Sequence, residues 1–332
     1  MKYTLNTIIL AAAVAAASVL SAEASTITMA MVTVGDPGNA ADTNGYGAVG
    51  YTYQMGKFDV TTSQYAAFLN AVATTSDPYG LYNSNMASQF AACGISQTVS
   101  SGTYSYATTR NGSFPVNYET WGDAARFANW LQNGQPNAPE GNGTTETGAY
   151  TLNGAITDSA LMAITRNPGA TYFIPSENEW YKSAYYKGGS TNAGYWTYPT
   201  KSNTAPGNTL PDTGNNANYY VNDYTDPTNY LTAVGAFSES PGPYGTFDQG
   251  GNVFQWNEAN FSGEYRGLRG GSWLYNWLYL ASSYRGSYSP SDEYLFVGFR
   301  VAGSAASPEP GGIAMLLAGA LAFGIWRLRR NA

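Results

Sequence analysis

The sequence of 332 residues contains no histidine and a single cysteine, Cys93. Without histidine, the chain cannot form a Ser-His-Asp triad, a Cys-His pair, a three-histidine zinc site or a two-histidine iron site. With one cysteine it can form neither an internal disulfide framework nor a metal site of several thiolates. Charged residues are also scarce, at 11% of the chain, against about 25% in ordinary globular proteins.

Aromatic and small residues are abundant instead. The chain has 28 Tyr, 13 Phe, 8 Trp and 38 Gly, and 43% of its residues are apolar. A chain of this length and composition can bury a substantial core. We find no internal repeat, and short strand-like runs stand among many turn residues. The sequence therefore predicts a loop-rich α+β fold, in one domain over residues 25–306.

The first residues have the pattern of a secretory signal peptide. Lys2 precedes an apolar run over residues 8–20, and Ala22 and Ala24 flank Glu23. A charged start, an apolar middle and a small-x-small cleavage site define such a signal. A short membrane anchor is the alternative, but the run is short for spanning a bilayer. We expect export, with cleavage at Ala22–Ala24 and removal of residues 1–24.

The last residues, 307–332, form a second three-part signal. A Pro-Glu-Pro motif precedes an apolar stretch over residues 311–326, and arginines follow. This order resembles the PEP-CTERM sorting signal of Gram-negative bacteria that make exopolysaccharide. The resemblance implies transient membrane anchoring, processing by an exosortase and release to the cell surface or the extracellular matrix. The residues that carry it are Pro308, Glu309, Pro310, Arg327, Arg329 and Arg330.

Removing both ends makes the chain more acidic. The full sequence has a net charge of −7; the ends contain four basic and two acidic residues, so the remainder is near −9. Nucleic acids and anionic membranes bind basic surfaces. The charge therefore argues against a nucleic-acid partner.

Three helices are predicted from caps and apolar spacing. They cover Thr62–Ala73, Thr120–Leu131 and a segment that opens at Ser176, where Glu179 completes a capping box. Strand-like runs cover Tyr51–Asp59, Tyr172–Ile174, Asn252–Trp256, Gly267–Trp273 and Val297–Ala302. Three long polar stretches, residues 74–111, 132–148 and 201–218, show no such pattern.

Read in order, these segments resemble the formylglycine-generating-enzyme (sulfatase-modifying factor) family. The sequence D-Q-G-G-N-V-F-Q-W over residues 248–256 stands where the family has D-M-x-G-N-V-W-E-W. Other matching blocks are Tyr53–Asn70, Phe114–Leu131, Ile174–Trp180, Leu268–Trp273, Tyr284–Arg285 and Gly298–Val301. The resemblance implies the family's C-type-lectin-like fold.

The family's oxidase chemistry is not implied. Oxidase members bind copper through two cysteines after R-G-G-S-W, and the matching positions here fall near Tyr275 and Leu280. Thiolate pairs suit copper(I) because both are soft. Iron-dependent relatives use histidines, which this chain lacks. We therefore expect no bound copper, no formylglycine formation and no catalytic residue from the family set.

The charged residues of the family blocks have structural interpretations. Glu177 and Glu179 could be an acid–base pair, but a helix N-terminus also stabilises both carboxylates. Arg269, Arg285 and Arg300 are expected in buried ion pairs, because a buried guanidinium needs an acceptor. Anion binding by these arginines is the alternative.

Aromatic residues gather after Gly271. If residues 273–279 form a strand, alternation places the odd-numbered aromatics on one face. They then either fill the space of a catalytic cleft or stack on sugar rings of an extracellular polysaccharide. The candidate ligand-binding residues are Trp273, Tyr275, Trp277, Tyr279 and Tyr284.

Calcium is the one metal that the resemblance implies. Family members bind it beside two of the matching blocks, and Gln255 here replaces a family glutamate, which weakens a site for a hard cation. The candidate ligands are Asn218, Asp226, Asn252 and Gln255.

Two functions remain open at this stage. The first is an exported, non-catalytic binding or structural module of the exopolysaccharide matrix. The second is a metal-dependent enzyme of the sulfatase-modifying factor family that uses residues outside the family pattern.

Overall fold

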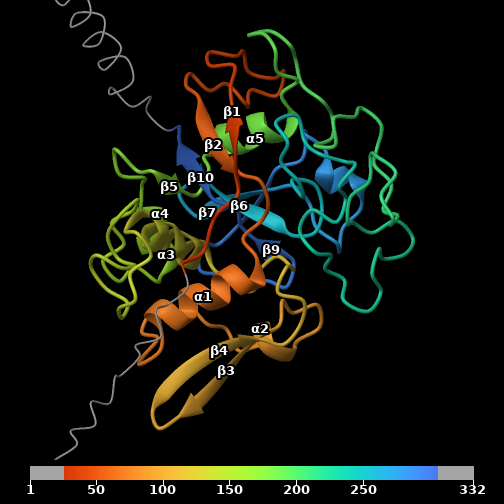
Figure 1. Ribbon diagram of the computed structural model, residues 1–332. Helices are drawn as coiled ribbons and strands as arrows, with labels where there is room; N and C mark the ends of the chain where they lie inside the picture. Colours follow the sequence, from red (N-terminus) through yellow and green to blue (C-terminus); the bar gives the residue numbers. More distant parts are fainter. Residues whose placement is uncertain (1–25, 306–332) are drawn as a thin grey trace, which may run out of the picture.

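The computed structural model describes residues 26–305, in which short helices and strands are joined by long loops (Figure 1). The predicted signal residues at both ends, with Ala22, Ala24 and the Pro-Glu-Pro motif, lie outside this range. The helices are α1 Thr62–Val72, α2 Asn85–Ser88, α3 Trp121–Gln132, α4 Asp158–Met162, α5 Glu177–Tyr185 and the 3-10 helix η1 Trp277–Leu280. The strands are β1 Met31–Val34, β2 Tyr53–Gly56, β3 Ile95–Ser100, β4 Thr103–Thr108, β5 Tyr172–Phe173, β6 Phe254–Phe261, β7 Tyr265–Arg269, β8 Gly286–Tyr288, β9 Val297–Gly298 and β10 Ala302–Ser304.

Two four-stranded sheets organise the molecule. The first has the order β1-β2-β10-β5 and is antiparallel, with Ala302 of β10 opposite Met55 of β2. The second has the order β8-β7-β6-β9, in which β6 and β9 run parallel. Strands β3 and β4 form a separate hairpin that projects beside α1 (Figure 1). This mixed, loop-rich arrangement is the α+β, C-type-lectin-like fold of the formylglycine-generating-enzyme type.

The three predicted helices are confirmed as α1, α3 and α5. Each begins with a capping box: Thr61 with Gln64, Thr120 with Asp123, and Ser176 with Glu179. In each box the two side chains satisfy backbone N–H groups that have no partner within the helix. The apolar faces of α1 and α3 then meet in the main core, where Phe68 packs edge-on against Phe127 at 5.4 Å between ring centroids.

Other segments differ from the sequence-based predictions. The unpatterned stretch 74–111 contains the β3–β4 hairpin, which turns at Ser101 and Gly102, both with positive φ. The predicted strand over residues 273–279 is wrong, because the chain turns after Gly271 and enters η1. A Cβ at Gly271 would lie 3.0 Å from the carbonyl carbon of Tyr279, so the chain folds back onto this glycine.

The buried guanidinium of Arg300 connects four segments. Its nitrogens donate to Asp59 Oδ1 at 3.0 Å, to the Gly56 carbonyl at 2.8 Å, to Gln255 Oε1 at 2.6 Å and to the Phe247 carbonyl at 2.8 Å. Both Arg300 and Asp59 are almost completely buried. These contacts join the first sheet, the segment before α1 and strand β6 of the second sheet.

A second ion cluster fixes the start of α5. Glu177 pairs with Arg269 and Arg285, each at 2.6 Å, and Glu179 pairs with Arg166 at 2.7 Å. The predicted ion pairs of Arg269, Arg285 and Arg300 are thus confirmed. Burial opposes the ionisation of Glu179, but Arg166 outweighs it and lowers the pKa of this carboxyl. Both glutamates therefore serve as ion-pair partners rather than as an acid–base pair.

Several other carboxyl groups are buried and have raised pKa values. Burial raises the pKa of Asp123 to about 7 and that of Asp248 to about 6. Burial and the neighbouring Asp77 raise the pKa of Glu140 to about 9. Each of these groups binds a proton more tightly in the folded chain than in the unfolded chain, so the folded state gains stability as these groups protonate.

Replacing Arg300 with Ala is expected to lower the free energy of unfolding by about 3–5 kcal/mol, because Asp59 is left buried and unpaired. Denaturant unfolding followed by fluorescence measures the change. Replacing the exposed Lys201 with Ala is the matched control and should change stability by about 0.5 kcal/mol or less. Equal effects of the two substitutions would contradict the structural role of Arg300.

Stability is expected to increase as the pH falls from 8 to 5. The folded chain takes up protons at Asp123 and Asp248 near pH 7 and 6, before the unfolded chain does so near pH 4. Replacing Asp123 with Asn should remove about 1–3 kcal/mol of this dependence, since one pKa unit corresponds to about 1.4 kcal/mol. Thermal unfolding across this pH range measures the slope, and a flat profile would contradict the raised pKa values.

Candidate functional site

The strongest candidate site is a cavity of about 210 Å³ lined by four tyrosines, here called the tyrosine cavity. It lies where residues 275–284, which include η1, pass strands β6, β7 and β8. Its lining residues are Phe254, Leu268, Tyr275, Tyr279, Tyr284, Gly286, Ser287 and Tyr288. The segment that carries Tyr275 and Tyr279 is the one in which the oxidases of the resembled family carry their cysteines.

The Glu177 ion cluster positions this segment. Arg269, at the end of β7, pairs with Glu177 and also donates to the carbonyls of Ser282 and Tyr284. Gly271 lets the chain turn back so that Leu280 packs over it. The buried charge network therefore holds the irregular segment after η1 against the strands that form the rest of the cavity wall.

The tyrosine rings pack against one another along the cavity wall. Tyr279 lies 4.5 Å from both Tyr275 and Tyr284 between ring centroids, and Phe254 meets Tyr275 edge-on at 5.6 Å. Burial raises the pKa of Tyr275 to about 12, and burial also raises the pKa of Tyr284 and Tyr288. These phenols stay neutral at physiological pH. The cavity offers aromatic faces and neutral hydroxyl groups but no ionised acid or base.

The structure brings together only part of the predicted aromatic set. Tyr275, Tyr279 and Tyr284 line the tyrosine cavity, whereas Trp273 and Trp277 do not. Trp273 is fully buried and packs against Tyr230 at 5.0 Å, and Trp277 is 43% exposed on η1. The predicted shared strand face was wrong, because Trp273 lies in the turn after Gly271 and Trp277 begins η1.

Phe254, Leu268 and Tyr288 also line the tyrosine cavity. They are not among the predicted ligand-binding residues, although Tyr288 belongs to the same group of aromatic residues after Gly271. Phe254 lies inside the matched D-Q-G-G-N-V-F-Q-W block. Its position in this block was the only indication in the sequence that it could belong to the site. Tyr288 belongs to β8, a three-residue strand with no periodic pattern of its own. Its place in the cavity follows only from the pairing of β8 with β7.

Copper does not fit the described residues. The two cysteine positions that the resemblance implies fall near Tyr275 and Leu280, neither of which carries a thiolate, and Leu280 is fully buried. Cys93 is buried elsewhere in the core, and burial raises the pKa of its thiol to about 12. Within residues 26–305, no group of three or more Asp, Glu or Cys residues is arranged to hold a metal ion.

The predicted calcium ligands do not form one site. Asn218 and Asn252 are adjacent, but Oδ1 of Asn252 accepts N–H bonds from Asn218 Nδ2 at 3.0 Å and from Thr232 at 3.1 Å. Oε1 of Gln255 accepts bonds from Trp180 at 2.7 Å and from Arg300 at 2.6 Å. A cation at Gln255 would meet the guanidinium charge of Arg300, which opposes binding.

Asp226 lies in a different loop environment. Its carboxylate accepts bonds from the backbone N–H groups of Thr228 and Asn229, both at 2.9 Å, and from Asn229 Nδ2 at 2.8 Å. These donors hold the pKa of Asp226 below its ordinary value, although burial opposes this. Three of the four predicted ligands, Asp226, Asn252 and Gln255, thus already use their side-chain oxygens as acceptors of N–H bonds, which opposes calcium binding.

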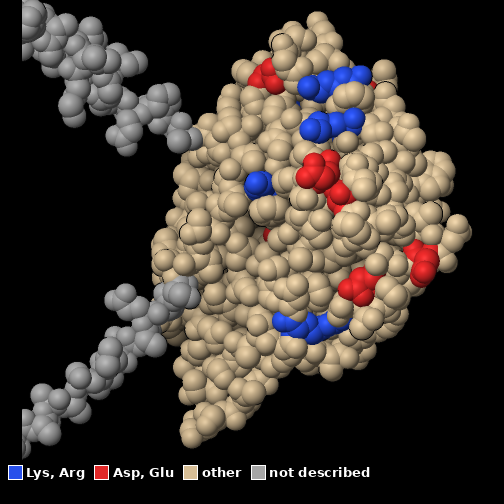
Figure 2. Space-filling model, turned by 45° about the vertical axis from the view of Figure 1, so that its right-hand side comes forward, with Lys and Arg blue, Asp and Glu red and all other residues tan. Residues whose placement is uncertain are grey.

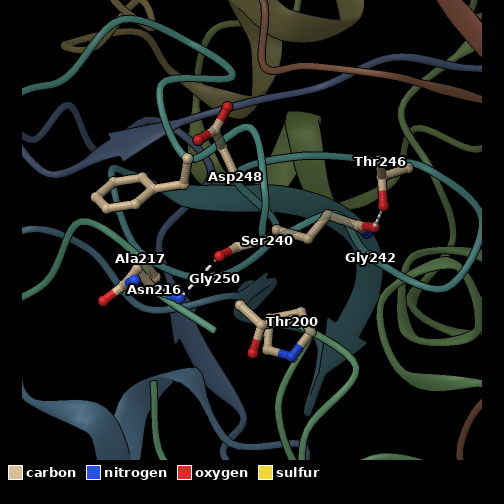
Figure 3. A pocket seen from close by; sticks show the side chains of 11 residues that line it. Thr200, Asn216, Ala217, Ser240, Gly242, Thr246, Asp248 and Gly250 are labelled. Carbon is tan, nitrogen blue, oxygen red and sulfur yellow. Dashed lines mark hydrogen bonds between the residues drawn. The ribbon is translucent and has the colours of Figure 1, made fainter. Parts of the chain in front are cut away.

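Two other cavities are weaker candidates. The pocket in Figure 3 holds only about 10 Å³, the lower limit for one water molecule. Its walls are tied by bonds from the Asn216 N–H to Ser240 Oγ and from Thr246 Oγ1 to Gln249 Oε1 (Figure 3). A cavity of about 490 Å³ reaches Arg166, whose charge is already paired with Glu179 and Glu258.

None of the helices within residues 26–305 has the length and apolar character needed to cross a membrane. The predicted C-terminal anchor falls outside these residues.

Comparisons with known proteins agree with the fold. Residues 27–305 match the family model of the sulfatase-modifying factor enzyme 1-like domain. The solved structure of CarF is similar, with a TM-score of 0.53 and 17% identity over 84% of this chain and 100% of that chain. Treponema denticola variable protein 1 has a TM-score of 0.49 and 18% identity over 85% and 98% of the two chains. No curated protein matches the chain in sequence.

Adding calcium or EDTA is expected to shift the melting temperature by less than about 1 °C, because the side-chain oxygens of Asp226, Asn252 and Gln255 already accept N–H bonds. Differential scanning calorimetry measures the shift, with magnesium at equal ionic strength as the control. A calcium-specific rise of several degrees would restore the calcium site predicted from the sequence.

Proposed function

The chain belongs to the sulfatase-modifying factor enzyme 1-like family, and from this premise we propose that it is a non-catalytic member that binds carbohydrate in the tyrosine cavity. One observation supports this proposal above the others. By resemblance, the oxidase cysteines correspond to positions near Tyr275 and Leu280, and Tyr275 lines a cavity rather than filling it. The chain thus has the family domain and a cavity in this region, but no cysteine there.

The chemistry of the cavity suits a sugar ring. Aromatic faces pack against the C–H faces of sugars, and the hydroxyls of Tyr275, Tyr279 and Tyr288 can exchange hydrogen bonds with sugar hydroxyls. The volume of about 210 Å³ is below the roughly 300–1,000 Å³ of sites for drug-sized ligands. The proposed ligand in this cavity is therefore one ring of a polysaccharide.

The proposal places this binding outside the cell. The signal peptide over residues 1–24 and the Pro308-Glu309-Pro310 motif support export, exosortase processing and retention at the cell surface or in the exopolysaccharide matrix of a Gram-negative bacterium. The net charge of −7 supports a partner other than nucleic acid. Calcium has no part in the proposed site, since its candidate ligands lie elsewhere.

Replacing Tyr279 with Leu is expected to weaken binding of the recognised glycan by about fivefold to tenfold, because one aromatic face is lost. A glycan array identifies the ligand, and calorimetry compares affinities. Replacing Tyr265 with Leu is the matched control, since Tyr265 is 41% exposed on β7 and does not line the cavity. Equal affinities of the two variants would remove the tyrosine cavity from the proposal.

The non-catalytic part of the proposal has its own test. The purified chain, loaded with copper(I), is incubated with a cysteine-containing peptide while oxygen uptake and aldehyde formation are followed. We expect neither, because no thiolate pair is present to bind the metal. Metal-dependent turnover would contradict the proposal and favour the enzyme alternative.

A further inference from the structure

A second cavity, larger than the first, lies at the base of the β3–β4 hairpin and is here called the Arg110 cavity. Its volume is about 720 Å³, within the usual range of ligand sites. It shares no lining residue with the tyrosine cavity. The walls come from residues 109–114, from Leu210 and from the loop over residues 225–236.

Arg110 lacks the carboxylate partner that other arginines of the described chain have. Five arginines pair with Asp or Glu: Arg126, Arg166, Arg269, Arg285 and Arg300. Within residues 26–305, Arg110 and Arg266 have no such pair. Arg266 is buried and donates to backbone carbonyls. Arg110, by contrast, is partly exposed and lines an open cavity.

Neutral acceptors hold the Arg110 guanidinium in place. Nη1 donates to the Ala92 carbonyl at 2.5 Å, and Nη2 donates to Asn229 Oδ1 at 2.7 Å. Asn229 is itself oriented by Asp226, to which its Nδ2 donates at 2.8 Å. The positive charge is therefore fixed in position without being neutralised by a direct ion pair.

The backbone makes room for the Arg110 side chain. Gly94 has a φ of +92°, and a Cβ at this position would lie 2.6 Å from Cβ of Arg110. The guanidinium carbon lies 5.7 Å from the centre of the Phe114 ring. A side chain packed along its stem and hydrogen-bonded at its tip loses little further freedom on binding, which favours affinity.

The rest of the lining is a mixture of small apolar and neutral polar groups. Thr109, Asn111 and Thr225 offer hydroxyl and amide groups, and Phe114, Leu210, Pro227, Ala233 and Ala236 offer apolar surface. Asp226 is the only acidic lining residue. Its oxygens accept three N–H bonds within the loop, and the nearby charge of Arg110, with which it forms no direct ion pair, also helps to lower its pKa against the effect of burial.

We propose that the Arg110 cavity is a second ligand site, which binds the carboxylate of an acidic sugar. The bonds to Ala92 and Asn229 leave other N–H groups of the guanidinium, and these can donate to a carboxylate. The amide and hydroxyl groups suit ring hydroxyls, and the apolar wall suits the C–H face of the ring. The cavity has one arginine and a nearby carboxylate, Asp226. This charge balance favours a ligand group with a single negative charge over a phosphate or several sulfates. The site does not depend on the tyrosine cavity.

The test uses the full chain and a tetrasaccharide in which glucuronate alternates with N-acetylglucosamine. Calorimetry compares this probe with its carboxyl-reduced form, in which each carboxylate has become a neutral hydroxymethyl group. We expect the acidic probe to bind at least about tenfold more tightly, since a hydrogen-bonded charge is lost in the reduced form. Raising the salt concentration should weaken only the acidic probe.

Substitutions locate the binding to this cavity. Arg110→Ala should reduce affinity for the acidic probe about tenfold and abolish the preference over the reduced form, and Arg110→Lys should restore part of that preference. Lys201→Ala, which removes an exposed cation elsewhere, and Tyr279→Leu should leave the preference unchanged. Thermal unfolding of each variant confirms that it is folded.

Three results would overturn the proposal. They are the absence of binding by the unmodified chain, equal affinity for the acidic and reduced probes, and an unchanged affinity in Arg110→Ala. Tighter binding of a sulfated tetrasaccharide than of the glucuronate probe would overturn the carboxylate assignment. Loss of binding in Tyr279→Leu alone would instead place the ligand in the tyrosine cavity.

Discussion

The fully buried guanidinium of Arg300 is the interaction on which the arrangement of the two main sheets depends. It takes acceptors from β2, from the segment before α1 and from β6, so these elements must reach one point together. Moving a charge out of water is costly unless every donor finds a partner. The same constraint explains why Gln255 is buried beside Arg300. Its neutral side-chain oxygen accepts hydrogen bonds from both Arg300 and Trp180. The hydrogen bonds of Arg300 thus determine how closely β2, the segment before α1 and β6 approach one another.

Hydrogen bonds from asparagine side chains hold the long loops. This suits a chain with few charged residues. Buried asparagine side chains form hydrogen bonds with backbone groups of the loops. Asn129 bonds to the backbone of Thr145 and Tyr150. Asn117 bonds to the backbone of Ala91, Cys93 and Leu295. An amide can both donate and accept, so it satisfies buried backbone groups without introducing charge. A chain with 11% charged residues can therefore keep irregular backbone ordered. Solvent-facing charge is correspondingly sparse on the face in Figure 2.

Local signals in the sequence were sufficient for the helices and the family but not for the sites. The capping boxes at Thr120 and Ser176 involve residues three apart, and such short-range patterns are visible in a sequence. The path after Gly271 depends on contacts with Leu280, and the β3–β4 hairpin has little apolar alternation because most of its side chains are exposed. No sequence motif marks Arg110, because the feature that distinguishes it is the absence of a carboxylate ion pair, which only the structure shows. The tyrosine cavity was predicted only in part, because Phe254 and Leu268 enter it from strands β6 and β7, outside the aromatic segment on which the prediction rested.

The position of β10 has a consequence for how the chain acquires its fold. β10 lies between β2 and β5, so the first sheet lacks an inner strand until residues 302–304 are available. β10 is about 250 residues from β2 and about 130 from β5 along the chain, and pairing over such distances is slow to form. Closing the first sheet therefore requires contacts between the beginning and the end of the described domain.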